Sequence, residues 1–327
     1  MTVYLKENGQ KKYLKGKQLV PQVSDLFIDK LYITLNIPKE HQQKAIQDLL
    51  AAENNGWLSN AFIKKSSYTN NWYMSTDNPI GDGAVLFQCQ PKKESHNFLR
   101  IEFNPAKADM ASIKTFFDQF VPGGYYDLIS KGTCNRIDLT VDVSFLDATE
   151  IIASYPKMKT EKHIGKGGKT ESKYLGATGS NKQIAIYDKS AEIIAKNKKK
   201  PGGLKKPVPE HKLLRVEMRL LKLGKSLKEL VGLENPLKDL TLIAFPGVLS
   251  AAAYDLTWKL FLRVCDNEGT AAALSYLSSE DKKLFEERLK KEGRTDWWKP
   301  EKIWLGFPAA IGKVLNVKGF IPISGQV

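Results

Sequence analysis

The chain has 327 residues, 42% of them hydrophobic, which predicts a globular protein of about two domains. Its 50 lysine and arginine residues outweigh 36 aspartate and glutamate residues, and the net charge of +14 favours a polyanionic partner, nucleic acid before a membrane surface. We expect no membrane segment, since no apolar run reaches the ~18 residues that span a bilayer and no signal peptide is present. The isolated cysteines Cys89, Cys134 and Cys265 suit neither a disulfide framework nor a zinc site, and indicate a reducing, cytoplasmic compartment.

The first part of the chain alternates strand and helix patterns. Residues 1–27 are polar and lysine-rich, lack a regular period, and are interpreted as a basic arm. Gly, Pro, Asn and Asp clusters separate the segments that follow, as in an antiparallel meander. The predicted strands cover 29–38, 61–67, 72–76, 84–90 and 98–104, and the predicted helices cover 39–53 and 110–120.

A long strand is predicted over 134–145, where polar and apolar residues alternate strictly. Successive side chains of a strand point to opposite faces, so one face is apolar and can pack against helices. The other face carries Arg136, Asp138, Thr140 and Asp142.

The same strand and helix patterns recur after residue 147 and then give way to longer helices. A hairpin is predicted from 172–176 and 182–189, followed by a helix that Ser190 caps, a strand over 212–221 and a helix over 225–231. Further helices are predicted over 248–265 and 279–291. Trp297 and Trp298 can stack on bases, although paired tryptophans more often pack a terminal segment onto a core.

These patterns predict an α+β fold: an antiparallel sheet core with helices on one face, a hint of two related halves, and a helical C-terminal region. The predicted boundaries are 1–27 for the arm, 28–238 for the main domain and 239–327 for the C-terminal region.

A tripeptide of arginine, apolar residue and acid occurs in three predicted strands and ends at Glu102, Asp138 and Glu217. In one sheet these carboxylates could converge on a single face and hold Mg²⁺ or Mn²⁺, which prefer oxygen ligands and act as Lewis acids on phosphodiesters. The four histidines are scattered singly, so any metal would be held by oxygen. Arginine and acid two residues apart on a solvated strand are also ordinary, and each pair alone has an even chance of being only structural.

The predicted hairpin supplies two candidate nucleophiles, Tyr174 and Tyr187, with Lys189 on the face of Tyr187. A phenol with a pKa of ~10 needs a cation or a metal to stabilise its phenolate, and Lys189 is a candidate for that role. Most strand tyrosines simply pack, and the pattern leaves the choice between the two tyrosines open.

Two lysine-rich segments flank the hairpin and are candidates for phosphate contacts. Solvated loops are an equally good interpretation of such runs. The candidate DNA-binding residues are Lys166, Lys169, Lys173, Lys198, Lys199, Lys200, Lys205 and Lys206.

Three segments in this order resemble the replication initiation factor family, which includes rolling-circle initiators of filamentous phages and small plasmids and related relaxases. They are Asn135–Asp142, Lys173–Glu192 with its Tyr-Leu-Gly and Tyr-Asp-Lys elements, and Leu214–Arg219. The resemblance covers about residues 95–225 and departs from plasmid members in the turn 176–180, which lacks a basic residue.

The resemblance implies a site-specific DNA endonuclease and strand transferase, in which a tyrosine becomes joined to the 5′ phosphate at a replication origin and leaves a 3′ hydroxyl. By position it assigns the nucleophile to Tyr174, the lysine to Lys189, and metal-binding acids to Asp138 and Glu217; Glu102 is added from the tripeptide pattern. The implied partners are origin DNA, single-stranded or extruded, and the host helicase and replication machinery. A conjugative relaxase with the same chemistry and a DNA-binding regulator without catalysis are the alternatives.

Overall fold

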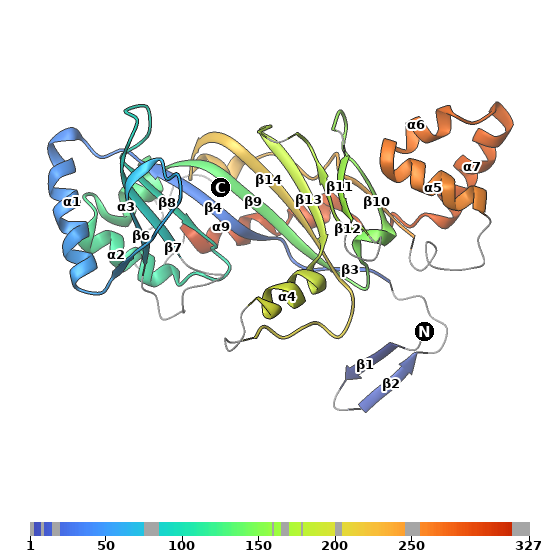
Figure 1. Cartoon of the computed structure of the whole chain (residues 1–327), viewed down its shortest axis with the longest axis horizontal. Helices are drawn as coiled ribbons and strands as arrows, with labels where there is room; N and C mark the ends of the chain where they lie inside the picture. Colours follow the sequence, from blue (N-terminus) through green and yellow to red (C-terminus); the bar gives the residue numbers. More distant parts are fainter. Residues whose placement is uncertain are drawn as a thin grey trace.

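One large antiparallel sheet organises the molecule in the computed structural model (Figure 1). The structure describes residues 3–7, 10–14, 20–74, 85–158, 160–164, 170–177, 179–199, 205–245 and 256–315. The 11-stranded sheet has the order β11-β12-β13-β14-β9-β4-β8-β7-β6-β5, and the short strand β3 pairs with β9. Its strands are β3 (Gln22–Val23), β4 (Phe27–Leu35), β5 (Leu58–Asn60), β6 (Tyr68–Met74), β7 (Val85–Pro91), β8 (Leu99–Phe103), β9 (Thr133–Ser144), β11 (Thr160–Ile164), β12 (Thr170–Leu175), β13 (Lys182–Asp188) and β14 (Leu213–Ser226). A separate hairpin of β1 (Val3–Glu7) and β2 (Gln10–Leu14) lies within the predicted arm.

The two halves of the sheet have the same topology. β4 and β9 pair in the middle of the sheet, and each is the first strand of its half. From each central strand the chain crosses to an outer edge, at β5 or β11, and returns through hairpins until β8 pairs with β4 and β14 pairs with β9. The hint of two related halves in the sequence therefore corresponds to a pseudo-twofold arrangement of strands.

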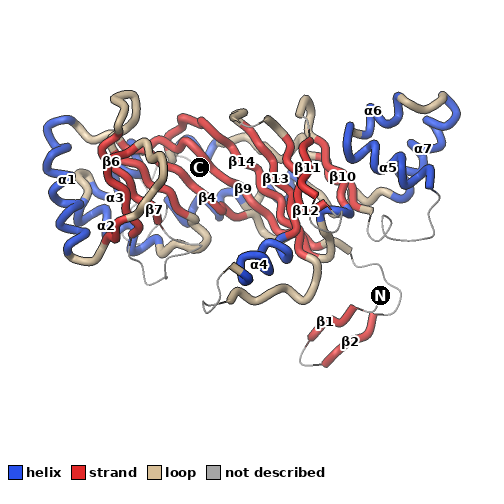
Figure 2. Tube along the Cα trace, in the orientation of Figure 1, coloured by secondary structure: helices blue, strands red, loops and turns tan. Residues whose placement is uncertain are grey.

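Helices cover the apolar face of the sheet, as Figure 2 shows for the first half. α1 (Lys39–Asn54), α2 (Met110–Phe120), α3 (Gly124–Lys131) and α9 (Phe307–Leu315) share one buried cluster with the sheet. In β9 the buried side chains of this face are Ile137, Leu139, Val141 and Val143, as the alternation predicts. The predicted fold class is confirmed, except that α4 (Lys189–Lys198) lies on the polar face, where Ala191 and Ala195 border a pocket.

The C-terminal helices divide between two places. α5 (Leu256–Glu268), α6 (Thr270–Ser275) and α7 (Ser279–Glu292) have their own apolar cluster beside β10 (Ile151–Ser154) and β15 (Thr241–Ala244). α8 (Pro300–Trp304) leads into α9, where the carbonyl of Val314 accepts a hydrogen bond from Tyr125 at 2.7 Å under the main sheet. Trp297 and Trp298 are buried, so they pack onto the core rather than present rings for stacking. The predicted domain boundaries stay predictions.

Several predicted elements differ locally from the structure. Residues 61–67 are not a strand, because the chain there is a loop between β5 and β6. β14 runs on to Ser226 before the 3₁₀ turns η2 (Glu229–Gly232), so the helix predicted over 225–231 is wrong. Asp188, rather than Ser190, caps α4 by accepting from the amide of Ala191. Another 3₁₀ turn, η1 (Ala148–Glu150), follows β9. Of the helix predicted over 248–265, residues 248–255 lie outside the described residues, and α5 covers the rest.

Within the described residues, no helix has the length and apolarity needed to cross a membrane.

Candidate functional site

The register of the central strands places the polar side chains of the tripeptides on one face of the sheet. Asp138 of β9 lies opposite Lys30 of β4 and opposite Arg219 of β14. Glu217 and Glu102 lie on the strands that flank this central pair. All three predicted acids line one open pocket of about 760 Å³ on this face. The alternation within each strand and the register between the strands together bring them to a common surface.

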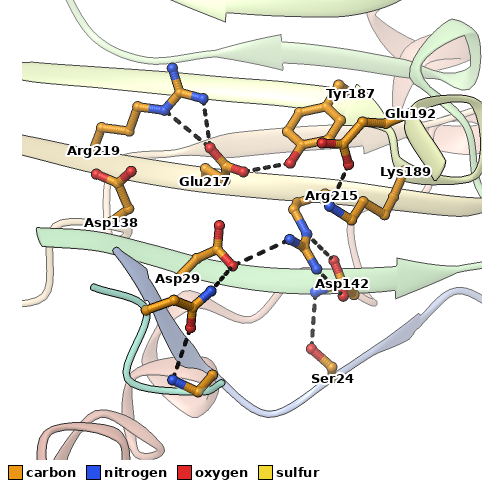
Figure 3. A network of polar contacts seen from close by, with 12 residues as sticks. Ser24, Asp29, Asp138, Asp142, Tyr187, Lys189, Glu192, Arg215, Glu217 and Arg219 are labelled. Atoms are coloured by element: carbon orange, nitrogen blue, oxygen red, sulfur yellow. Dashed lines mark hydrogen bonds and ion pairs between the residues drawn. The ribbon is translucent and has the colours of Figure 1, made fainter. Parts of the chain in front are cut away.

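Each of these acids is paired with a cation. Arg136 holds Asp138 through two hydrogen bonds, at 2.7 and 2.6 Å. The Nη2 atom of Arg219 lies 2.6 Å from Glu217 (Figure 3). Lys30 lies 2.6 Å from Glu102, whose side chain is 18% exposed. Charge-assisted bonds of this kind fix the carboxylates in place and offset the cost of burying them.

Asp138 is the most deeply buried of the three acids, with 3% of its surface exposed. Burial raises the pKa of Asp138, the pairing with Arg136 opposes the rise, and the neighbouring charge of Glu217 adds to it. The charges of Asp138 and Glu217 therefore interact, whereas Glu102 forms an ion pair with Lys30.

The predicted metal-binding set does not form a metal-binding group in the structure. Among the described residues, no group of three or more His, Cys, Asp or Glu side chains is arranged to hold a metal ion. A cation at Asp138 and Glu217 would have to compete with the guanidinium groups of Arg136 and Arg219. The residues as placed do not fit a divalent metal, and metal dependence stays a prediction.

Tyr187 is held at the centre of the polar face by Glu217. Its hydroxyl donates a hydrogen bond of 2.5 Å to Oε1 of Glu217, and the Lys189 ammonium lies 5.6 Å from its ring centroid. Burial, together with the charge and the hydrogen bond of Glu217, raises the pKa of Tyr187 well above its usual value. Lys189 itself forms an ion pair with Glu192 in the first turn of α4. Ionisation of Tyr187 is thus opposed by its surroundings.

Tyr174 is half-buried at the edge of the same pocket. The His163 ring packs edge-on against it at 5.2 Å, and the guanidinium carbon of Arg219 lies 5.9 Å from its ring centroid. Within the part of the chain that the structure describes, its hydroxyl makes no hydrogen bond. Tyr174 therefore borders the pocket with the Arg219 guanidinium near its ring, and its hydroxyl has no partner among the described residues.

A second polar network, which the sequence did not predict, extends the site along β9 (Figure 3). Arg215 is buried and makes two hydrogen bonds to Asp142, at 2.7 and 2.8 Å. It also lies 3.5 Å from Asp29, which accepts a hydrogen bond of 2.8 Å from Asn104. Asp29 lies at an irregularity in the pairing of β4 with β9, and alternation alone could not place it here. The pairing of Arg215 with Asp142 depends on the register of β14 with β9, which no local pattern reveals.

The predicted phosphate-binding lysines have different surroundings. Lys198, Lys199, Lys205 and Lys206 are exposed at the end of α4 and in the loop before β14. Lys166, Lys169 and Lys200 lie outside the described residues.

The buried position of Lys173 contradicts its predicted role as a phosphate contact. It is 1% exposed and donates a hydrogen bond of 2.9 Å to Asp266 of α5 and another to the carbonyl of Ile151. Its neighbour Tyr174 faces the pocket, so the alternation of β12 sends Lys173 to the opposite, buried face.

The chain was compared with protein families, curated proteins and solved structures. No protein-family profile matches the chain, and no curated protein matches it in sequence. One solved structure that resembles it is described as a rolling circle replication initiator protein from Geobacillus stearothermophilus, with 15% sequence identity and a TM-score of 0.38. That match covers 72% of this chain and 90% of the other chain.

Proposed function

We propose that the protein is a rolling-circle replication initiator: a site-specific single-strand DNA endonuclease and strand transferase that joins Tyr174 to a 5′ phosphate. The substrate would be origin DNA, single-stranded or extruded from the duplex. Host helicase and replication proteins would act on the nicked product.

One observation carries this proposal. The three segments that resemble replication initiation factors, far apart in the sequence, occupy the adjacent strands β12, β13, β14 and β9. They bring Tyr174, Glu217 and Asp138 to the same pocket on an open sheet face. The pocket thus combines a phenol, a guanidinium and carboxylates on one open face, and the choice of Tyr174 as nucleophile follows the resemblance.

In the proposed reaction, the Tyr174 oxygen attacks the scissile phosphorus. A bond between phosphorus and the tyrosine oxygen forms, the bond between phosphorus and the 3′ oxygen breaks, and the proton of the phenol is balanced by the proton that the leaving 3′ oxygen takes up. Arg219, whose guanidinium carbon lies 5.9 Å from the Tyr174 ring centroid, would neutralise the developing negative charge. Lys189 lies beside Tyr187, so its proposed role is to bind phosphate rather than to activate Tyr174. No step is assigned to a metal.

The exposed lysines next to α4 should supply much of the salt-dependent affinity for DNA. Replacing Lys198, Lys199, Lys205 and Lys206 by glutamine is expected to reduce the slope of log K against log salt for single-stranded DNA by up to ~3. The matched control replaces Lys39, Lys44, Lys114 and Lys131, on the helices of the opposite face, and should leave the slope unchanged. Fluorescence anisotropy across a salt series measures both, and equal slopes for the two variants would contradict the assignment.

Covalent capture tests the proposed function. The protein is incubated with labelled single strands that tile its own locus, in Mg²⁺, in Mn²⁺ and in chelator, and analysed on a denaturing gel. A DNA-linked band that resists denaturant is expected on one strand, and its loss in chelator would establish the predicted metal dependence. Absence of such a band on every strand, with binding retained, would overturn the proposed chemistry.

The pairing of each predicted acid with an arginine or lysine favours one alternative, a DNA-binding regulator without catalysis, because such pairs also serve as a purely structural network. Under that alternative the chain binds DNA in chelator and forms no adduct. A conjugative relaxase would give the same adduct, and the strand that it cleaves would lie at a transfer origin.

A further inference from the structure

The strands of the two halves correspond in order, and some of the residues at corresponding positions are alike. In the second half, neighbouring positions across β12, β13, β14 and β9 are Tyr174, Ala185, Glu217 and Thr140. In the first half, neighbouring positions across β6, β7, β8 and β4 are Tyr73, Leu86, Glu102 and Tyr32. Tyr73 thus has the place in the first half that Tyr174 has in the second, and Glu102 has the place of Glu217.

Both tyrosines line the same pocket. Tyr73 is half-buried like Tyr174, and Leu86 and Glu102, the next positions across the sheet, also line the pocket. Trp72, its neighbour in β6, is buried in the apolar core, so Tyr73 projects from the polar face. The pocket therefore has a tyrosine on each of its two outer sides.

The charged residues of the two halves differ in the central pair of strands, β4 and β9, where the halves meet. Lys30 and Asp138 lie opposite one another in the central pair of strands. In the second half Asp138 adds a carboxylate near Glu217, whereas in the first half Lys30 lies 2.6 Å from Glu102 and neutralises it. Arg100, two residues before Glu102, lies 3.4 Å from the same carboxylate. In the first half one acid, Glu102, thus has two cations beside it, whereas in the second half Asp138 and Glu217 each have one arginine. The excess of positive charge in the first half suits contact with a phosphate of the DNA backbone.

We propose that Tyr73, with Lys30 and Arg100 at Glu102, forms a second subsite for the strand of DNA that reacts at Tyr174. The Tyr73 ring and the side chain of Leu86 would support a base by stacking, and Lys30 and Arg100 would contact the backbone. The inference rests on the proposed function for the identity of the ligand as single-stranded DNA.

The separation of the two tyrosines gives this subsite a length requirement. Seven strand-to-strand steps separate β12 from β6, which is about 34 Å measured along the sheet at ~4.8 Å a step. A stacked strand of about ten nucleotides has this length at ~3.4 Å a nucleotide. The two tyrosines are therefore too far apart to contact the same phosphate, and one strand of about ten nucleotides would lie across both.

Length-dependent binding tests the subsite. Fluorescence anisotropy is measured with oligothymidylates of five and 20 nucleotides on the wild-type protein, Tyr73→Ala, Tyr73→Phe and Tyr126→Ala. The gain in affinity from the short to the long strand is expected to fall ~5- to 100-fold in Tyr73→Ala and to persist in Tyr73→Phe, which keeps the ring. Tyr126, on α3 at the opposite face, is half exposed and serves as the matched control, whose gain should equal that of the wild type. Circular dichroism melting checks that each variant is folded.

Other outcomes separate the subsite from the proposed function. A gain in affinity that depends on Tyr73, in a protein that forms no covalent adduct, would support the subsite and overturn the nuclease. A normal adduct with the same gain in Tyr73→Ala as in Tyr126→Ala would overturn the subsite alone. A DNA adduct found on Tyr73 would also overturn it, because Tyr73 would then be a nucleophile.

Discussion

Replacing Tyr174 by phenylalanine is expected to abolish the covalent protein–DNA adduct, with a loss of at least ~1,000-fold in the rate of its formation. The variant lacks the only atom that attacks phosphorus in the proposed reaction. Since the Tyr174 hydroxyl makes no hydrogen bond within the described residues, its removal leaves none of their polar groups without a partner, and DNA binding and folding should be preserved.

The Tyr187→Phe variant is the matched control, because it removes the same atom from a neighbouring strand. Its hydroxyl is engaged by Glu217 and its pKa is raised by burial and by that carboxylate, so we expect the adduct to form, at a rate reduced by the disturbance of Glu217. Denaturing gels over a time course measure both rates. If Tyr187→Phe loses the adduct and Tyr174→Phe retains it, the nucleophile is Tyr187, activated by Glu217 as a base.

Replacing Lys173 by methionine is expected to lower the free energy of unfolding by about 3–5 kcal/mol. The side chains of Lys173 and Asp266 are 1% and 9% exposed, so removal of the lysine leaves the Asp266 carboxylate buried with its cationic partner gone. This pair joins α5 to β12 immediately before Tyr174. Denaturant unfolding followed by circular dichroism measures the change.

The double variant Lys173→Met with Asp266→Leu distinguishes a buried ion pair from simple loss of packing. Replacing both partners by apolar residues also removes the buried carboxylate that Lys173 had neutralised, so the double variant should recover most of the lost stability. Lys131→Met is the control, since Lys131 pairs with Asp127 at the surface with its side chain 65% exposed, and it should cost less than ~1 kcal/mol. A double variant as unstable as Lys173→Met would contradict the ion-pair explanation.

The alternation of β9 was sufficient to predict which of its side chains pack into the apolar core and which share the polar face, but not that Asp138 and Thr140 of the polar face are buried as well. The period of two is a local property of a strand, and it also predicted that the tripeptides ending at Glu102, Asp138 and Glu217 could meet on one face. The same rule, applied to β12, places Lys173 opposite Tyr174. The phosphate contact predicted for Lys173 was wrong because the lysine was assigned by its charge and not by its position in the strand.

Pairing between distant strands could not be predicted from these local patterns. The partner of Arg215 is Asp142 and not Glu217, two residues away, because β14 lies against β9 with Arg215 opposite Asp142. The irregularity at Asp29 shifts the alternation of β4, and nothing in its sequence marks it. The equivalence of Tyr73 and Tyr174 likewise appears only when the two halves are compared strand by strand.

The most direct test of the proposed function is the mass spectrum of the trapped adduct. The covalent complex is digested with nuclease and protease, and the peptide that carries a nucleotide phosphate is fragmented to locate the modified residue. We expect the mass of the nucleotide phosphate on Tyr174, in the segment Thr170–Leu175 of β12. A modified residue elsewhere, or a protein that retains DNA with no nucleotide on any peptide, would contradict it.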